Sequence, residues 1–348
     1  MAKIFVIRTS SLGDVAMLVP VIYSVASRYP QDRFVVMTRQ AFTPLFNSLG
    51  FNMSCCPLDT RKRHKSFLGL LKILCKANGQ GFSHVADMHN VLRSKIIRTA
   101  MRFTFTKVAK IDKGRTEKRL MLDDKNTAQP LKPTIERYFD VFEKLGFPAE
   151  MIFENLYSFK TREFRYLKNI VSEKAGTWIG IAPFAQHKGK ILPEEQMDKL
   201  IETLSKRPNT SIFLFGAGKK ESEKIETWAN KYPNIIKHSG KVNLELELLL
   251  ISYLDVMISM DSANMHLASL VKVPVVSIWG ATHPSLGFYG FNQDINNAVQ
   301  VDLDCRPCSV YGNVPCPYEG ERHYKCLKQI SSQMVLDKVE KVLENKKS

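Results

Sequence analysis

The first residues whose types and spacing suggest chemistry lie in VIRTSSLGDVAMLVP (6–20). This stretch begins as a β-strand and ends as a helix, but its turn lacks the G-x-G-x-x-G of a dinucleotide site. Instead it carries Ser10, Ser11, one glycine and the carboxylate of Asp14. A carboxylate here can act as a general base or can cap its helix. The serines are alternative caps, which would leave Asp14 for chemistry, and a helix N-terminus should lower its pKa.

A second candidate site lies in SMDSANMHLASLVKVPVVSIWGATHP (259–284). A strand ends at Asp261, and Ser262 and Asn264 open a helix whose first N–H groups are available to a phosphate. His266 lies in the first turn of that helix. The following strand ends in GATHP, and two small-residue loops at one sheet edge favour a nucleotide diphosphate. The alternative is ordinary N-capping by Asp261 or Ser262.

Two lysines form a third candidate, in APFAQHKGKILPEE (182–195). Lys188 and Lys190 lie in a loop just before a helix that Pro193 opens. A lysine at this place can neutralise a departing pyrophosphate without a metal. Either lysine can equally be a solvated loop residue.

The charge of the chain indicates a polyanionic partner. The 348 residues carry a formal net charge of +16. Ten Lys and Arg between Arg93 and Arg119 face only Asp112 and Glu117, and TRKRHK (60–65) adds a second basic cluster. Such runs are typical of solvated faces, but they also fit nucleic acid, a phosphorylated glycolipid or an anionic membrane. Since no aromatic stacking platform accompanies them, nucleic acid is not expected.

Targeting signals and cysteines indicate the compartment. The N-terminus has no secretory h-region, and the most apolar stretch (15–26) is shorter than the roughly 20 residues of a membrane span. The seven cysteines are an odd number, and Cys55 and Cys56 are adjacent. The absence of a secretory signal favours a reducing cytoplasm over a disulfide framework. CRPC (305–308) with Cys316 and Cys326 could hold a structural zinc, or these could be packed, reduced thiols.

Strand-like and helical runs alternate through most of the chain. This alternation predicts parallel sheets with helices on both faces, and two such series joined near 160–176 predict two Rossmann-like domains. Ligands of such sheets bind beyond the carboxyl ends of the strands, so the candidate sites are expected to converge on one interdomain cleft. The expected strands are 3–9, 33–39, 84–89, 177–184, 211–218, 256–261 and 273–281. The main expected helices are 14–28, 91–103, 134–147 and 331–344.

Several of these motifs together resemble one family. The chain resembles the ADP-heptose:lipopolysaccharide heptosyltransferases, which have the two-domain GT-B architecture. The likeness rests on RTSSLGDV near the N-terminus, DMHNVLRS (87–94), KILPE (190–194) and DSANMHLA (261–268) followed by GATHP, and the CRPC tail is also similar. It implies an α/β fold of two Rossmann-like domains whose parallel sheets face a central cleft. The expected boundaries are 1–170 for acceptor binding, 171–328 for the nucleotide sugar, and 329–348 for a helix packing back towards the N-terminal domain.

The resemblance also implies roles for individual residues. Asp14 matches the catalytic base, and Lys190 matches the phosphate-binding lysine better than Lys188 does. The implied donor contacts are Asp261, Ser262, Ala263 and His266, with Glu221 near the adenosine. The implied acceptor contacts are Arg61, Arg63 and Arg93. Three positions depart from the family pattern: Leu192 replaces an aromatic residue, Ala263 replaces a glycine, and the loop SLGFYGF (285–291) is longer than expected.

The resulting expectation is an inverting glycosyltransferase that moves heptose from ADP-heptose to the lipopolysaccharide inner core. Its partners would be ADP-heptose, the phosphorylated lipid A–inner core acceptor and an anionic inner-membrane surface. It would be a cytoplasmic enzyme, peripheral to the inner membrane of a Gram-negative bacterium, and would need no metal and no cofactor. Two alternatives remain: a GT-B-like enzyme with another donor or epimerase activity, and a basic, non-enzymatic nucleic-acid-binding protein.

Overall fold

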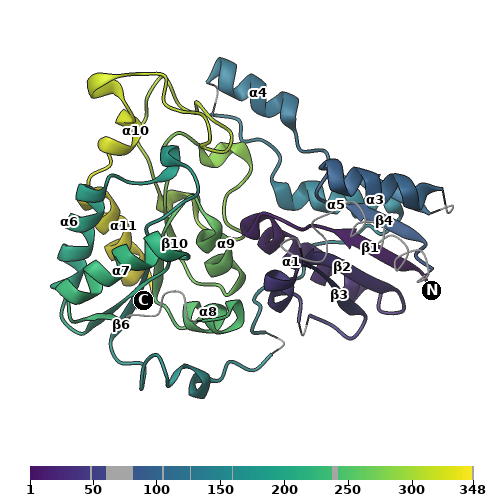
Figure 1. Ribbon diagram of the computed structural model, residues 1–348, viewed down its shortest axis with the longest axis horizontal. Coiled ribbons are helices and arrows are strands. Elements are labelled where there is room, and N and C mark those ends of the chain that lie inside the picture. The colour runs from purple at the N-terminus through teal and green to yellow at the C-terminus, as the bar shows by residue number, and fades with distance from the viewer. Residues whose placement is uncertain are drawn as a thin grey trace. The chain divides into compact units, whose positions relative to one another are not determined.

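The computed structural model describes residues 1–47, 49–59, 81–103, 106–125, 127–158, 160–236 and 242–346. The chain divides into two compact units (Figure 1). Unit 1 comprises Met1–Lys113 and Thr134–Lys160, and unit 2 comprises Gly114–Pro133 and Thr161–Ser348. Each unit is built on one parallel sheet, as the alternating sequence pattern predicts. In the ranges described, every helix is too short or too polar to traverse a lipid bilayer.

The sheet of unit 1 has five strands in the order β3-β2-β1-β4-β5, all parallel. Apolar runs such as KIFVI and RFVVMTR form its central strands, which are buried on both faces. The strands are β1 (Lys3–Ile7), β2 (Arg33–Arg39), β3 (Met53–Leu58), β4 (His84–Asp87) and β5 (Lys107–Lys110).

Helices cover both faces of this sheet. On one face α1 (Leu12–Arg28) packs beside α5 (Thr134–Leu145), whose buried Phe142 meets Phe34 of β2 edge to face. On the other face the apolar side of α3 (Leu92–Arg102) contributes Ile97 and Met101 to a core with Phe5, Val85 and other strand residues. This sandwich fixes the carboxyl ends of β1 and β4 side by side, where Ile7 pairs with Asp87.

The sheet of unit 2 has six parallel strands in the order β11-β10-β9-β6-β7-β8. They are β6 (Thr177–Ala182), β7 (Thr210–Leu214), β8 (Ile235–Ile236), β9 (Val256–Met260), β10 (Val275–Ile278) and β11 (Ala298–Val299). Four of its strands, β6, β7, β9 and β10, are apolar runs that the sequence predicts, with ends up to four residues from the predicted ones. The sequence does not predict β8 and β11, which have two residues each.

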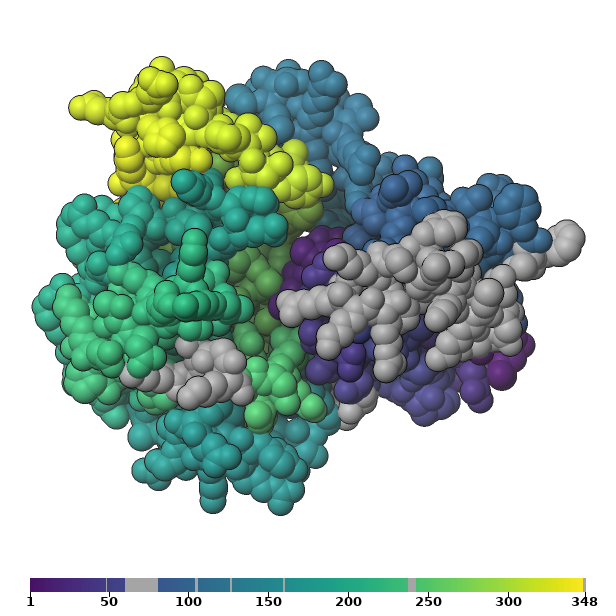
Figure 2. Space-filling view, in the orientation of Figure 1, coloured from purple at the N-terminus to yellow at the C-terminus, as the bar shows by residue number. Residues whose placement is uncertain are grey.

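Two sets of helices enclose this sheet. One core joins the strands to α6 (Glu194–Ser205), α7 (Lys219–Lys231) and α11 (Ser332–Asn345). The side chains of α6 and α7, teal to green, form much of the visible surface of this unit (Figure 2). On the other face α9 (Ala263–Leu270) packs on β9 and β10 and beside α8 (Leu244–Ile251). The short helices are η1 (Gln40–Leu45), η2 (Phe164–Leu167), η3 (Lys188–Lys190), η4 (Pro284–Leu286), η5 (Ile295–Asn297), η6 (Gly320–Arg322) and α10 (Lys325–Lys328).

The C-terminal helix does not pack where the sequence predicts. Residues 329–348 are expected to pack towards the N-terminal domain. Instead α11 packs beside α6 and against β9 and β10 of unit 2. The physical reason is its apolar face: Val335, Val339 and Leu343 recur at helical spacing and are buried in the unit 2 core. The helix is therefore part of the unit 2 layer structure.

The boundary expected at residue 170 also differs, because the chain changes units more than once. Residues 114–133, with α4 (Arg115–Asp124), belong to unit 2, and the final change lies between Lys160 and Thr161. Long-range hydrogen bonds hold the inserted segment: Ser285 Oγ donates to Thr127 O at 2.9 Å, and Lys125 Nζ donates to Pro307 O at 2.9 Å. Such contacts are made between distant stretches of sequence, which a local pattern does not reveal.

Each sheet reverses its strand order at one place. In unit 1 the reversal lies between β1 and β4, and in unit 2 it lies between β6 and β9. Ligands of open α/β sheets bind outside the carboxyl ends of the strands at such a switch point. The loops that follow β1 and β4, and those that follow β6 and β9, are therefore the places to look for function.

Candidate active site

Asp14 lies in the first turn of α1, directly beyond the carboxyl end of β1. Ser11 is the N-cap residue of the helix, and Asp14 is three residues further on. Its Oδ2 atom accepts hydrogen bonds from Ser11 N at 3.1 Å and Ser11 Oγ at 2.7 Å, and lies 2.5 Å from Nη2 of Arg8. Asp14 therefore takes part in capping its helix, which is the structural role that the sequence allows. It does so through Oδ2 alone.

The second oxygen of Asp14 is the one available for chemistry. Among the residues that the structure describes, Oδ1 has no hydrogen-bond partner, and 25% of the side chain remains exposed. Burial alone would raise the pKa of Asp14, but the charge of Arg8 and the hydrogen bonds from Ser11 outweigh it and lower the pKa below its ordinary value. The predicted direction of the shift is confirmed, and Arg8 is the main reason for it.

Arg8 is itself held in place from three sides. Its side chain is 6% exposed, its Nη1 donates to Met88 O at 2.6 Å, and its guanidinium lies 5.9 Å from the centre of the Tyr138 ring. The Tyr138 hydroxyl donates to Asp14 O at 3.1 Å, which ties the start of α1 to α5. The ion pair between Arg8 and Asp14 thus has a fixed geometry.

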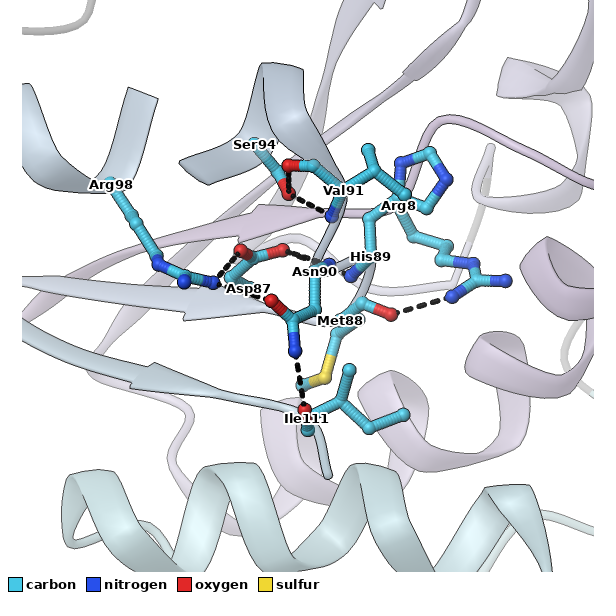
Figure 3. A network of polar contacts seen from close by, with 9 residues as sticks. All are labelled: Arg8, Asp87, Met88, His89, Asn90, Val91, Ser94, Arg98 and Ile111. Carbon is cyan, nitrogen blue, oxygen red and sulfur yellow. Dashed lines mark hydrogen bonds and ion pairs between the residues drawn. The ribbon is translucent and has the colours of Figure 1, made fainter. Parts of the chain in front are cut away.

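A polar network at the end of β4 lies next to this pair (Figure 3). Asp87, fully buried, accepts hydrogen bonds from the backbone N–H groups of His89 and Asn90 at 3.0 and 2.7 Å. Its other oxygen lies 2.6 Å from Nη1 of Arg98, which also donates to Asn90 Oδ1 at 3.0 Å. The network fixes the turn that carries Met88 O, the acceptor of Arg8. The sequence predicts none of these roles, although DMHNVLRS contains all the residues.

His89 joins this turn to the Asp14 loop. Its Nδ1 lies 2.9 Å from Thr9 Oγ1 and its Nε2 lies 3.3 Å from Ser10 Oγ. Burial and the charges of Arg8 and Lys113 lower the pKa of His89 to about 4. The imidazole is therefore neutral at physiological pH, and it can accept one hydroxyl hydrogen bond while it donates another.

The predicted acceptor arginines have different outcomes. Arg61 and Arg63 lie outside the described residues. Arg93 lies in the first turn of α3 and is half-buried, and no hydrogen bond or ion pair joins its guanidinium to any other described residue. A cation in this state is available to an anionic ligand.

The predicted donor residues of unit 2 gather at the second switch point. Lys190, at the end of η3 after β6, places Nζ 2.8 Å from Oδ2 of Asp261, which follows β9. Thr282, from the GATHP loop after β10, donates its hydroxyl to the same oxygen at 2.8 Å. Lys190 and Asp261 are 16% and 7% exposed as side chains. Lys188 is exposed, so the geometry favours Lys190 for binding a phosphate.

The N-terminus of α9 lies beside this pair. Ser262 is the N-cap residue, but its side chain makes no capping hydrogen bond; its Oγ lies 3.3 Å from Ser259 Oγ instead. Ala263 is the first residue of the helix, and His266, 7% exposed, lies in the same turn. The first N–H groups of α9 are thus not capped by Ser262, and they add a positive dipole end next to Lys190.

The tail, which is the segment between β11 and α10, approaches the Lys190 side chain at Gly312. A Cβ atom at Gly312 would lie 2.6 Å from Lys190 Cγ, so only glycine permits this approach. In the middle of η3, Gly189 O accepts a hydrogen bond from Ala281 N at 2.8 Å. The tail and the GATHP loop therefore set the position of the lysine.

Arg306 anchors the tail beneath the same loops, and the sequence does not single it out. It is 5% exposed and donates to the carbonyl oxygens of Gly280 at 2.5 Å and Thr282 at 2.9 Å, and also to Val301 O. A guanidinium with several carbonyl acceptors fixes loops that have no strand partners. In the sequence, the CRPC motif suggests a role for its cysteines. In the structure, Arg306 of this motif makes the hydrogen bonds that hold the loops.

The remaining predicted residues have structural partners. Glu221, in the first turn of α7, accepts a hydrogen bond from Ala217 N at 2.7 Å, and its role near the adenosine stays a prediction. Leu192, where the family has an aromatic residue, is 2% exposed in the unit 2 core. The tail cysteines Cys305, Cys308, Cys316 and Cys326 are free thiols. Over the described ranges, no three His, Cys, Asp or Glu side chains are grouped as a metal site.

Comparison with known proteins decides the family. The sequence profile described as "Glycosyltransferase family 9 (heptosyltransferase)" matches residues 71–318. The chain belongs to this family. It is therefore a glycosyltransferase, which confirms the resemblance drawn from the motifs.

Named relatives of this family 9 enzyme match it over most of its length. Lipooligosaccharide heptosyltransferase 2 of Campylobacter jejuni serotype O:6 is 24% identical over 350 residues, covering 98% of this chain and 99% of that protein. Lipopolysaccharide core heptosyltransferase OpsX of Haemophilus influenzae is 25% identical, covering 85% of this chain and 83% of that protein. Neither relative supports the alternatives of an epimerase or a nucleic-acid-binding protein.

Solved structures confirm the fold. The structure of E. coli ADP-heptose LPS heptosyltransferase II superposes with a TM-score of 0.71 at 18% identity, covering 99% of this chain and 100% of that chain. E. coli heptosyltransferase WaaC with ADP-2-deoxy-2-fluoro heptose gives 0.67 at 18% identity, covering 97% and 99%. The family 9 chain thus has the GT-B architecture that the sequence predicts.

Proposed function

We propose that this family 9 glycosyltransferase transfers a heptose from ADP-heptose to the inner core of lipopolysaccharide. Two relatives are named as lipooligosaccharide or lipopolysaccharide core heptosyltransferases, and a solved neighbour carries an ADP-heptose analogue. The observation that carries the proposal for this chain is the Asp14 carboxylate. Arg8 keeps it ionised, and its Oδ1 has no hydrogen-bond partner among the described residues.

The reaction assigns one role to Asp14. An acceptor hydroxyl attacks the anomeric carbon of the heptose, and the bond from that carbon to the phosphate oxygen breaks. The hydroxyl proton passes to Asp14 Oδ1, and the electron pair of the broken bond leaves with ADP. A carboxylate with a lowered pKa is a modest base, but the attacking hydroxyl becomes more acidic as its bond to carbon forms. A single displacement of this kind inverts the anomeric centre.

The donor roles fall to unit 2. Lys190 and the N-terminus of α9 bind the pyrophosphate and stabilise the charge that grows on it as the sugar leaves. Asp261, freed from Lys190 as the phosphate takes its place, accepts hydrogen bonds from heptose hydroxyls. Ser262, Ala263 and His266 line the same turn, and Glu221 contacts the adenosine part. The positive charges of Lys190 and the α9 N-terminus neutralise the departing pyrophosphate, which is the role a metal ion would otherwise have. The reaction therefore requires no metal and no cofactor.

The acceptor roles fall to unit 1. Arg93 and the basic segment that contains Arg61 and Arg63 bind the phosphates and acidic sugars of the inner core, and the enzyme works in the cytoplasm on the surface of the inner membrane. The excess of positive charge, +16 over the chain, suits such a phosphorylated, lipid-linked acceptor. Acceptor affinity should therefore weaken as ionic strength rises.

The test is release of ADP from ADP-heptose by the full-length enzyme, with and without a truncated inner-core acceptor. ADP-glucose serves as the control donor. The proposal predicts release that depends on both ADP-heptose and the acceptor. Release without acceptor would indicate hydrolysis or another reaction of the donor, and acceptor-dependent release from ADP-glucose alone would exclude heptose as the sugar.

A further inference from the structure

The outward face of α3 carries two large apolar side chains that contact little protein. Leu92 is 76% exposed and Phe103, which follows the last helical residue, is 83% exposed. They are eleven residues apart, so at about 100° per residue they point in nearly the same direction, about 16 Å apart along the axis. Both side chains therefore project from one face of the helix.

Cations surround these two side chains. Lys95 and Arg102 lie on α3, and the edge strand β5 next to β4 adds the exposed Lys110, which lies on the same face of the sheet as Val108 of the core below α3. Within the part of the chain that the structure describes, none of the three has an ion-pair partner. The sequence of α3 contains no acidic residue. The face therefore combines apolar anchors with unneutralised positive charge.

The opposite side holds α3 firmly on its unit. Ile97 and Met101 are buried in the core below the helix, and Ser94 Oγ accepts a hydrogen bond from Val91 N at 2.9 Å. Arg98 turns inward and pairs with the buried Asp87. Because the helix is fixed on its unit, Leu92 and Phe103 can insert into an apolar environment together. The helix need not unfold for this.

We propose that this face of α3 docks the enzyme on an anionic lipid bilayer, with Leu92 and Phe103 inserted among the headgroups and the three cations Lys95, Arg102 and Lys110 against lipid phosphates. Amphipathic helices with apolar and Lys/Arg-rich sides bind at such interfaces, and each cation gains from the negative surface potential. A nucleic acid would match the charge, but it would leave Leu92 and Phe103 without an apolar partner. The inference rests on the proposed function, because a lipid-linked acceptor is presented at a bilayer surface.

The experiment is co-sedimentation of the full-length enzyme with vesicles of phosphatidylethanolamine and phosphatidylglycerol, and with vesicles of phosphatidylcholine alone. The test variant is Leu92→Ser/Phe103→Ser. The matched control is Phe51→Ser/Ile152→Ser, which removes two other apolar side chains of unit 1 that are 89% and 55% exposed. Both variants are also assayed for ADP release with a lipid-free, truncated acceptor.

The proposal predicts that the test variant binds anionic vesicles about tenfold more weakly, from loss of partly buried apolar area. The control variant should bind like the wild type, and the wild type should bind phosphatidylcholine vesicles weakly. Equal binding by test variant and wild type, or binding that requires lipopolysaccharide acceptor in the vesicles, would overturn it. Activity on the lipid-free acceptor should stay unchanged in the test variant, so a failure of docking is distinguishable from a failure of the proposed reaction.

Discussion

Arg8 joins the Asp14 carboxylate to the turn after β4. One guanidinium nitrogen lies 2.5 Å from Asp14 Oδ2, and the other donates to Met88 O at 2.6 Å. Met88 lies between Asp87 and His89, and the Asp87 carboxylate accepts a hydrogen bond from His89 N in the network of Figure 3. The position and the proton affinity of Asp14 are therefore set from the neighbouring strand as well as from its own helix.

Replacing Arg8 should change the pH dependence of the reaction. The positive charge of Arg8 lowers the pKa of Asp14, so Arg8→Gln should raise it. Because Asp14 must be ionised to accept a proton, the acidic limb of kcat/KM should move to higher pH. Arg8→Lys keeps the charge and should move the limb less. An acidic limb that is identical in Arg8→Gln and the wild type would show that Asp14 is not the group that titrates.

The ion pair of Lys190 and Asp261 should have separable structural and catalytic effects. Lys190→Met leaves a carboxylate that is 7% exposed without its cation and should cost about 3 kcal/mol of unfolding free energy. The double variant Lys190→Met/Asp261→Asn should recover most of that stability, yet stay about 10²–10³-fold slower than the wild type. Urea unfolding and ADP release measure the two effects. A double variant with wild-type kcat would remove Lys190 from leaving-group stabilisation.

Gly312 should matter more for activity than its distance from any strand suggests. Gly312 has φ +73° and a Cβ there would lie 2.6 Å from Lys190 Cγ, whereas Gly320 has φ +59° and open space around it. Gly312→Ala and Gly320→Ala should each lose about 1 kcal/mol from backbone strain. Only Gly312→Ala should also raise KM for the donor, because it displaces Lys190. Equal donor KM values in the two variants would contradict this account of the tail.

His89 should make unit 1 sensitive to acid. The pKa of His89 falls from 6.5 to about 4 on folding, so between these values the unfolded chain binds a proton that the folded chain does not. Stability from this group is fully present above 6.5 and is lost as the pH falls through this window. In urea unfolding, His89→Gln should therefore lose less stability across the window than the wild type, and His323→Gln, at an exposed histidine, should behave like the wild type. An equal loss in His89→Gln and the wild type would show that His89 does not take up this proton.

The sequence predicts most of the sheet and both switch-point loops, because buried parallel strands are continuous apolar runs. It misses four strands. One is β3, whose Met53–Leu58 run mixes serine and cysteine with apolar residues, and another is β5, which has a lysine at each end. The other two, β8 and β11, have two residues each. It also assigns residues 114–133 to the wrong unit, since hydrogen bonds to Ser285 and Pro307 decide their place. Such contacts join segments that are far apart in the sequence.

The candidate site divides in the same way. Asp14, Lys190 and Asp261 could be proposed because residue type and place at a strand end are visible in the sequence. Arg8 and Arg306 could not, because their roles depend on carbonyl oxygens that only the folded chain brings within reach. The sequence signal that could have indicated them is a single arginine inside a motif noted for other residues, RTSSLGDV and CRPC.

The most direct test of the central claim is the rate of ADP release from ADP-heptose by Asp14→Asn with saturating acceptor. Asparagine keeps the shape of the side chain but cannot take up the hydroxyl proton. We predict a rate about 10²–10⁴-fold below the wild type, with unchanged affinity for ADP, since the proposed donor contacts belong to unit 2. A rate equal to that of the wild type would contradict the account and leave Asp14 as a helix-capping residue.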